Sequence, residues 1–382
     1  MAGKRCRARL ARAARPHAWA TAVLTGVLAA LIVGCGAAGT ASQAGDISAG
    51  TPREPAGTIS ETGSTLLYPL AKTWAGAYHQ QHPGVTVTTA GTGSGAGIKD
   101  ASADTVDIGA SDAYLSSGDL VKNPTLLNIP LVVSAQTVIY NLPTLSAGVH
   151  LHLNGIVLAG MYNGTIKTWN NPAIAKLNPG VTLPATKVVP IHRSDSSGDT
   201  FLFTSYLSTQ DSGNWGNPIG YGTTVLWPPV PGAKAEKGST NMLASCDATP
   251  GCVAYNGISY LPGAKQDGLG EAALANAAGQ PELPTPQTIL ASISSFVSLT
   301  PPNETISMID GPSSGGYPIV NYEYAVVSTK QQSAAKASEI KAFLRWVITT
   351  GNQPAYLNAV GFQSLPPTLV TLGEAQIGEI GS

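Results

Sequence analysis

The sequence has little charge and no excess of positive charge. Only 11% of its 382 residues are charged and 43% are hydrophobic, a balance that excludes an intrinsically disordered chain. Of the 21 basic residues, six precede the first carboxylate, Asp46, so that 15 basic residues face 22 acidic ones in the rest of the chain. A net-negative body is a poor general binder of nucleic acid, which is therefore not expected as a partner. A bound anion would need local hydrogen-bond donors.

The N-terminus has the pattern of a bacterial export signal. A basic segment precedes an uncharged stretch, and Leu31-Ile32-Val33-Gly34-Cys35 looks like a lipobox, in which the cysteine is lipidated and becomes the first residue. We therefore expect a signal peptide over 1–35, lipid on Cys35 and a flexible Gly/Ala/Ser/Thr/Pro-rich tether over 36–57. The body would then be anchored on the outer face of the cell membrane. The alternative is that the N-terminal segment is retained as a transmembrane anchor. With either anchor, the folded part of the chain lies outside the cytoplasm.

Cysteine is scarce beyond the signal peptide. Cys246 and Cys252 flank a turn-prone stretch, 247–251, and in an exported protein this pattern is typical of a small disulfide loop. A metal site on this pair would need further ligands, and no histidine lies close in sequence. We therefore expect a disulfide and no metal.

Motifs for nucleotide cofactors and for hydrolysis are weak or incomplete. Gly91-x-Gly93-x-x-Ala96 with Asp112 fits a permissive dinucleotide pattern, but the preceding strand is not the first of its unit, and no Walker lysine motif is present. Gly311-x-Ser313-x-Gly315 matches a nucleophile elbow, yet no histidine follows His192, so the order Ser, acid, His fails. No cofactor is expected, and an exported phosphoester hydrolase is the weaker alternative.

Strand and helix patterns alternate from residue 58 onward. The length allows two hydrophobic cores, and the alternation predicts an α/β fold with largely parallel sheets. The hydrophobic periods predict strands at 85–88, 106–109, 137–140, 187–192 and 319–327, and helices at 66–78, 154–161, 201–207, 287–296 and 333–349.

Three turns before predicted helices are rich in glycine and hydroxyl residues. They span 61–66, 91–97 and 193–200, and the last begins with Arg193. Free backbone N–H groups and the positive end of the helix dipole suit a small oxyanion. Each turn taken alone is also explained as an ordinary helix cap or a flexible turn.

An acidic residue, Asp112, follows the strand predicted at 106–109. An ionised carboxylate can only accept hydrogen bonds, so it favours an anion that still carries a proton. Protonated phosphate can donate to it, whereas sulfate at neutral pH cannot, which gives specificity. The alternative is an ordinary strand-end aspartate that caps the next turn.

Four ordered motifs together resemble the phosphate-binding lipoproteins of bacterial high-affinity phosphate ABC transporters (the Pst-type family, and its actinobacterial branch in particular). The likeness covers about residues 58–367. The motifs are Gly63-Ser64-Thr65, Gly91-x-Gly93-Ser94-Gly95, Gly109-Ala110-Ser111-Asp112 and Arg193-x-Asp195-x-Ser197-Gly198.

The resemblance implies a two-lobed periplasmic binding protein fold of type II, with two mixed sheets flanked by helices and a hinged cleft. Lobe I would hold residues 58–135 and 320–382, and lobe II residues 136–319. The chain would not be an enzyme. It would capture inorganic phosphate and deliver it to the membrane subunits of an ABC permease.

The same resemblance assigns the phosphate ligands. Arg193 would form a bidentate clamp held by Asp195, and Asp112 would accept the ligand proton. Ser64 would support the first turn. The remaining donors would be the Thr65 hydroxyl and N–H, the Leu66 N–H, Ser94, Ser197 and the Gly198 N–H.

Asp199 departs from the broader family, in which many members have threonine. We hypothesise that it accepts a second ligand proton, so that dihydrogen phosphate is bound well. The competing view is that Asp199 complements the helix N-terminus. Other readings of the whole chain are a receptor for arsenate, sulfate or molybdate, and a surface adhesion lipoprotein.

Overall fold

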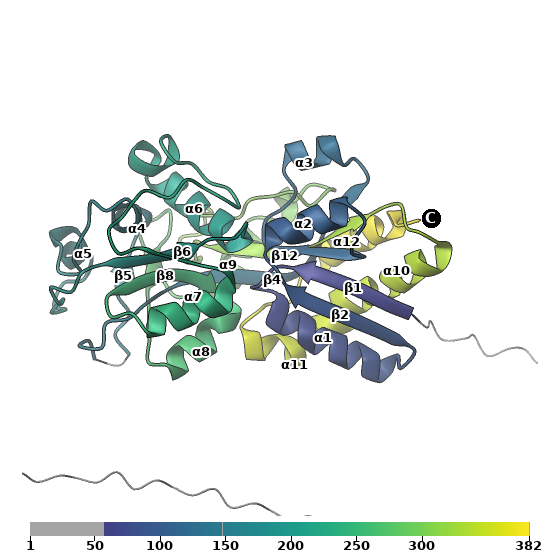
Figure 1. Ribbon diagram of the computed structural model, residues 1–382, viewed down its shortest axis with the longest axis horizontal. Coiled ribbons are helices and arrows are strands. Elements are labelled where there is room, and N and C mark those ends of the chain that lie inside the picture. The colour runs from purple at the N-terminus through teal and green to yellow at the C-terminus, as the bar shows by residue number, and fades with distance from the viewer. Residues whose placement is uncertain (1–56, 147, 382) are drawn as a thin grey trace, which may run out of the picture. The chain divides into compact units, whose positions relative to one another are not determined.

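The computed structural model describes residues 57–146 and 148–381 (Figure 1). The chain divides into Met1–Pro52 and Arg53–Ser382, and every described residue belongs to the second unit. The predicted signal peptide, Cys35 and the tether up to residue 56 lie outside the described residues. Within the described residues, no helix has both the length and the apolar character needed to span a membrane.

The core of the unit is a nine-stranded sheet of order β2-β1-β3-β12-β4-β8-β6-β7, with β9 paired to β4. Three strands form a second sheet of order β11-β10-β5. The strands are β1 (Gly57–Gly63), β2 (Val85–Gly91), β3 (Ile108–Ser111), β4 (Leu126–Tyr140), β5 (His152–Leu153), β6 (Val189–Arg193), β7 (Lys234–Glu236), β8 (Cys252–Gly257), β9 (Gly270–Glu271), β10 (Ala273–Ala275), β11 (Pro281–Glu282) and β12 (Val320–Ser328).

The long strand β4 belongs to both halves of the large sheet. Its residues up to Ala135 pair with β12, and its residues from Gln136 onward pair with β8. The expected pair of sheets is therefore continuous through β4. Pairing is parallel in β2-β1-β3 and in β7-β6-β8, but antiparallel wherever β4 or β12 takes part. The sheet is thus mixed rather than largely parallel.

Helices surround the sheet on both sides of β4 (Figure 1). The helices of eight or more residues are α1 (Tyr68–Gln81), α2 (Ser94–Ser102), α4 (Gly155–Tyr162), α6 (Gly198–Gln210), α7 (Gly238–Asp247), α9 (Pro286–Ser294), α10 (Ala334–Ile348) and α12 (Pro367–Glu379). Shorter ones are α3 (Ser117–Lys122), α5 (Pro172–Leu177), α8 (Leu261–Gln266) and α11 (Pro354–Leu357). Single helical turns occupy Ser212–Gly216, Ile258–Tyr260, Val297–Leu299, Thr350–Asn352 and Asn358–Val360.

Local signals set several helix boundaries. Ser333 caps α10 by accepting a hydrogen bond from the Lys336 N–H, and Asn154 caps α4 in the same way. Buried apolar side chains of α1, such as Leu70 and Trp74, belong to a hydrophobic core that extends through both halves of the sheet. The expected disulfide is confirmed: Cys246 in the last turn of α7 is bonded to Cys252 at the start of β8.

The carboxyl ends of the parallel strands place the candidate turns together. β1, β2 and β3 run parallel and end at Gly63, Gly91 and Ser111, while β6 ends at Arg193. Each of the predicted turns therefore follows a strand end and leads toward a helix start. In α/β sheets this edge is the usual place for ligands.

Candidate functional site

The first turn begins where β1 passes very close to β3. Gly63 has φ +143°, and a Cβ there would lie 2.0 Å from the Ala110 carbonyl oxygen, so a side chain is excluded. The Ser64 Oγ accepts a hydrogen bond from the Leu67 N–H at 2.8 Å and holds the turn before α1. Thr65 and Leu66 are buried in this turn.

The second turn starts α2 and contacts the third turn. Ser94 is the first residue of α2, and its Oγ accepts a hydrogen bond from the Asp112 N–H at 3.2 Å. The Gly95 N–H donates to the Ser196 carbonyl oxygen at 3.1 Å. This bond joins residues that are far apart in sequence and come from the two halves of the sheet.

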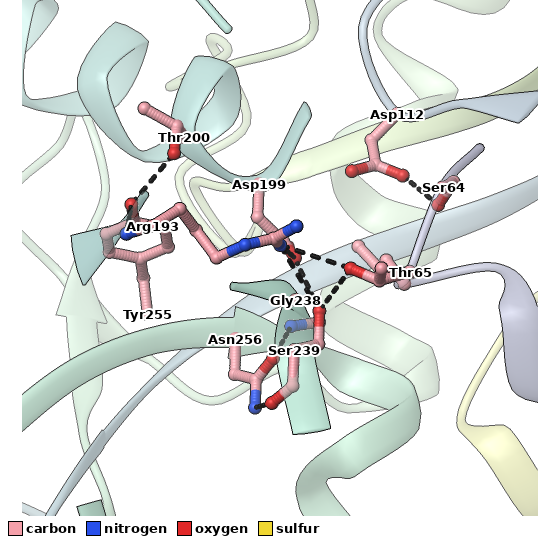
Figure 2. Close-up of polar contacts among 12 residues, drawn as sticks. Ser64, Thr65, Asp112, Arg193, Asp199, Thr200, Gly238, Ser239, Tyr255 and Asn256 are labelled. Atoms are coloured by element: carbon pink, nitrogen blue, oxygen red, sulfur yellow. Dashed lines mark hydrogen bonds and ion pairs between the residues drawn. The ribbon is translucent and has the colours of Figure 1, made fainter. Parts of the chain in front are cut away.

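Arg193 is buried at the end of β6, and each nitrogen of its guanidinium group has a hydrogen-bond partner. Its Nε and Nη2 donate to the two oxygens of Asp195, at 2.7 Å from Nε to Oδ1. Its Nη1 donates to Asp199 Oδ2 and to Thr65 Oγ1, both at 3.1 Å. Asp195 therefore occupies the Nε–Nη2 edge. The Nη1 side of the group faces Thr65 of the first turn (Figure 2).

The start of α6 provides groups that point into the same region. Ser197 is buried, and its Oγ has no hydrogen-bond partner among the described residues. Gly198 lies against Asp112 and Ser94: a Cβ on Gly198 would be 2.5 Å from Asp112 Oδ2 and 2.6 Å from Ser94 Oγ. Asp199, the next residue, is 1% exposed.

The sequence-predicted residues thus meet in one buried cluster. Figure 2 shows Thr65, Arg193 and Asp199 in direct contact, with Asp112 bonded to Ser64 beside them. Leu66 follows Thr65 in the first turn, and its carbonyl oxygen accepts from Ser259 Oγ at 2.7 Å. Ser313 lies elsewhere, in a turn that no helix follows, which removes the nucleophile-elbow reading.

Sequence analysis missed Ser239, at the start of α7. Its Oγ lies 2.7 Å from Thr65 Oγ1 and donates to Asp199 Oδ2 at 3.0 Å. The signal was present, because Gly238-Ser239-Thr240 repeats the tripeptide Gly63-Ser64-Thr65 after a short strand. A fourth helix start therefore borders the cluster.

Gln136 and Glu323 were also missed. Gln136 Nε2 donates to Asp199 Oδ1 at a distance of 3.0 Å. Gln136 is the residue of β4 at which pairing with β8 begins. Glu323 lies on β12 with no exposed surface, and its Oε2 is 3.1 Å from Ser64 Oγ. No local motif marks either residue, because long-range strand pairing alone brings them to the cluster.

The carboxyl groups of the cluster differ in pKa because their surroundings differ. Burial and then the charge of Asp112 raise the pKa of Asp199 to about 6, although the ion pair with Arg193 opposes this shift. Burial also raises the pKa of Asp112 and, to a greater degree, that of Glu323. For Asp195, burial is outweighed by the hydrogen bonds and charge of Arg193, so its pKa is lowered.

The chemistry of the cluster suits a small anion that carries hydrogen. Arg193, hydroxyl groups and helix N-termini supply donors, while Asp112 and Asp199 supply acceptors. Among residues 57–146 and 148–381, no three His, Cys, Asp or Glu side chains are grouped to hold a metal ion. Beside the cluster, Gly95 and Ser196 line a groove of about 650 Å³ together with Lys99, Tyr114 and Phe201.

Comparisons with known proteins identify the family of the chain. Residues 48–350 match the family described as a PBP superfamily domain. The phosphate-binding protein PstS of Methanocaldococcus jannaschii is 36% identical over 339 residues, covering 82% of this chain and 84% of that protein. PstS 3 of Mycobacterium leprae is 32% identical over 340 residues, covering 84% of this chain and 88% of that protein. The solved phosphate-binding protein of Stenotrophomonas maltophilia shares the two-lobed fold, with a TM-score of 0.65, 20% identity and coverage of 84% and 94% of the two chains.

Proposed function

Because this chain belongs to the PBP superfamily and, within it, to the PstS phosphate-binding proteins, we propose that it binds inorganic phosphate outside the cytoplasm and delivers it to an ABC-type permease. The observation that carries the proposal is the meeting of helix-start donors, Arg193 and Asp112 in one buried cluster. A receptor of this kind changes no covalent bond, and its relatives are transport receptors rather than enzymes.

The ligand contacts that we propose follow the side chains that converge. Arg193 would bind phosphate oxygens through its Nη1 side, because Asp195 holds the opposite edge. Ser197 Oγ is buried, has no hydrogen-bond partner within 57–146 and 148–381, and would donate to the ligand. Asp112 would accept the ligand proton. The other proposed donors are the Thr65 hydroxyl and N–H, the Leu66 N–H, Ser94 and the Gly198 N–H.

The lobes that we propose divide where β4 changes partner, between Ala135 and Gln136. Residues 58–135 and 320–382 would form lobe I, and residues 136–319 would form lobe II. The ligand would contact both lobes, since Thr65 and Asp112 come from one and Arg193 and Ser197 from the other. Binding across this boundary would favour a closed arrangement, which is the form that a permease can recognise.

We also propose that Cys35 carries a lipid that holds the protein on the outer face of the membrane. The lipobox Leu31–Cys35 supports this proposal. Growth of cells with a labelled fatty acid should label the wild-type chain and not the Cys35→Ser variant. Equal labelling of both would contradict it.

Isothermal titration calorimetry with phosphate, arsenate, sulfate and molybdate tests the proposed function. We expect phosphate to bind with a dissociation constant of about 1 µM or lower, which needs roughly −8 kcal/mol. Sulfate and molybdate should bind at least about 100-fold more weakly, because Asp112 repels an anion with no proton to donate. Tighter binding of sulfate than of phosphate would overturn the assignment. Turnover of a chromogenic phosphoester would favour the hydrolase alternative.

A further inference from the structure

We propose that Glu323 is a positioning residue for phosphate: a buried acid that keeps its proton and, together with Ser64, holds Asp112 in its ionised, proton-accepting form. This inference rests on the proposed function. It concerns a residue of β12 that lies more than 200 positions from Asp112 in the sequence. Its carboxyl group touches the acceptor of the ligand proton rather than the ligand.

The contacts of Ser64 set up the argument. Its Oγ hydrogen-bonds to Asp112 Oδ1, lies 3.1 Å from Glu323 Oε2 and accepts from the Leu67 N–H at 2.8 Å. Asn321 Nδ2 donates to Glu323 Oε1 at 2.9 Å. All of these side chains are buried, so each of their polar atoms needs a hydrogen-bond partner.

Counting hydrogens places one proton on the pair formed by Asp112 and Glu323. The Ser64 hydroxyl has one hydrogen and faces two carboxyl groups, so it can satisfy only one of them as a donor. With that hydrogen directed to Asp112, the remaining lone pair of Ser64 Oγ matches a donor on Glu323. A protonated Glu323 supplies this donor, either to Ser64 Oγ or directly to the Asp112 carboxylate, which lies within hydrogen-bonding reach.

Electrostatics assigns this proton to Glu323 rather than to Asp112. Burial and the neighbouring charge of Asp112 raise the pKa of Glu323 well above its usual range. For Asp112, burial is opposed by hydrogen bonds from Glu323, Ser64 and Ser94 and by the charge of Arg193. The titratable groups that act on Glu323 are Asp112 after β3 and Asp199 at the start of α6. Tyr324, the next residue on its strand, is itself affected by the charge of Glu323, and Val132 of β4 pairs with Glu323 and carries no charge.

The consequence for the ligand lies in the second oxygen of Asp112. Figure 2 shows this oxygen pointing away from Ser64, and it is the oxygen that faces Gly198 at the start of α6. A neutral Glu323 helps to fix Asp112 Oδ1, the oxygen bonded to Ser64, and adds no negative charge next to Asp112. An ionised Glu323 would repel both the Asp112 carboxylate and the phosphate, because like charges that are buried close together raise the free energy of the ionised forms.

The test compares Glu323→Gln with Glu323→Leu by phosphate calorimetry on the full-length protein. Glutamine keeps the shape, a donor for Ser64 and an acceptor for Asn321, so its affinity at pH 7 should stay within threefold of wild type. Leucine removes the donor and should weaken binding at least tenfold. Glu304→Gln is the matched control, since Glu304 is also fully buried, but its carboxyl group hydrogen-bonds to Gln376 rather than to the cluster.

A pH series separates this role from simple packing. As the pH is raised from 7 through the elevated pKa of Glu323, the ratio of wild-type to Glu323→Gln affinity should fall because Glu323 loses its proton. Forming a ratio cancels the titration of phosphate itself. Binding by Glu323→Gln that is more than threefold tighter than by wild type at pH 7 would overturn the proposal, since it would mean that Glu323 is ionised. An equal loss of phosphate affinity in Glu323→Gln and Glu323→Leu would also overturn the proposal.

An infrared difference spectrum gives a readout that does not depend on phosphate or on the leucine variant. Wild type minus Glu323→Gln at pH 7 should show the C=O stretch of a protonated carboxyl group, and absence of this band would refute the proposal. Failure of the wild-type protein to bind phosphate would instead refute the proposed function. The two failures are therefore distinguishable.

Discussion

The guanidinium group of Arg193 pairs with Asp195 through one edge and presents Nη1 to the cluster through the other. Its Nε–Nη2 edge is held by Asp195, and its Nη1 reaches Thr65 and Asp199. The guanidinium group is rigid and always charged, so fixing one edge fixes the direction of the other. Asp195 therefore orients the donor that we assign to phosphate.

Replacing Arg193 with alanine should weaken phosphate binding at least about 100-fold. Two lost charge-assisted hydrogen bonds are each worth about 1.5–3 kcal/mol, and Asp195 and Asp199 would lose their cation. Calorimetry measures the effect. Arg345→Ala is the control, because its ion pair with Glu374 at 2.8 Å is exposed. A loss of less than threefold for Arg193→Ala would contradict its assignment as a ligand.

Asp199 already has protein partners in the cluster. Its Oδ2 accepts from Arg193 and Ser239, and its Oδ1 accepts from Gln136. Each carboxylate oxygen has two lone pairs, so Oδ1 can still accept a proton from the ligand. The hypothesis of a second proton acceptor therefore stays open to test.

The pH dependence of Asp199→Thr tests this hypothesis. The pKa of Asp199 is about 6, so below that pH the side chain is protonated and loses its accepting oxygen. From pH 5 to 7, wild-type affinity should rise relative to Asp199→Thr. Above neutrality it should fall again as dihydrogen phosphate is replaced by monohydrogen phosphate. Calorimetry from pH 5 to 8 measures both profiles, and profiles that coincide would disprove a role for Asp199 in accepting a ligand proton.

At the scale of elements, the start of α6 packs directly on the loop after β3. Gly198 permits this contact, because any Cβ there would collide with Asp112 and Ser94. The hydrogen bond from Gly95 to Ser196 joins α2 to the same turn. Helix starts from the two halves of the sheet are thus held within hydrogen-bonding distance of one another.

Gly198→Ala should weaken phosphate binding at least tenfold without unfolding the protein. Alanine is the better helix former, so the helix itself is not weakened, while the added methyl group pushes α6 away from Asp112. Gly378→Ala is a matched control in α12, where a Cβ meets nothing within 4 Å. Calorimetry combined with circular dichroism measures both effects. Wild-type affinity in Gly198→Ala would show that this contact does not shape the site.

At the scale of the folded unit, β4 couples the two halves. It pairs with β12 over one part and with β8 over the other, and it is buried along almost its full length. One hydrophobic core extends across it. A ligand held by residues from both halves should therefore stabilise the whole unit rather than one part.

Phosphate should raise the unfolding temperature in a single cooperative transition. At a free concentration of about 1,000 times the dissociation constant, a ligand specific for the folded state stabilises it by about 4 kcal/mol. Differential scanning calorimetry with phosphate, and with sulfate at equal ionic strength as the control, measures this shift. Two separate transitions, of which phosphate moves only one, would contradict binding across both halves.

Some features were determined by the sequence alone because they depend on neighbours along the chain. The helices expected at 154–161, 287–296 and 333–349 were found within about two residues. Their caps and hydrophobic periods are local signals. The turns at Ser64, Ser94 and Ser197 were identified for the same reason, since each joins a strand end to a helix start.

Other features were decided only by the tertiary structure. The first part of β4 was not predicted, and it contains Pro130, a residue that is rare inside strands. In the structure Pro130 pairs with Tyr324, next to an irregularity in the pairing of β4 with β12 between Glu323 and Tyr324. Ser239, Gln136 and Glu323 reach the cluster from distant segments. Strand pairing between such segments depends on which faces of the sheet become buried together. No short stretch of sequence determines which distant strands pair. The local turns could therefore be predicted from the sequence, whereas the position of Glu323 next to Asp112 could not.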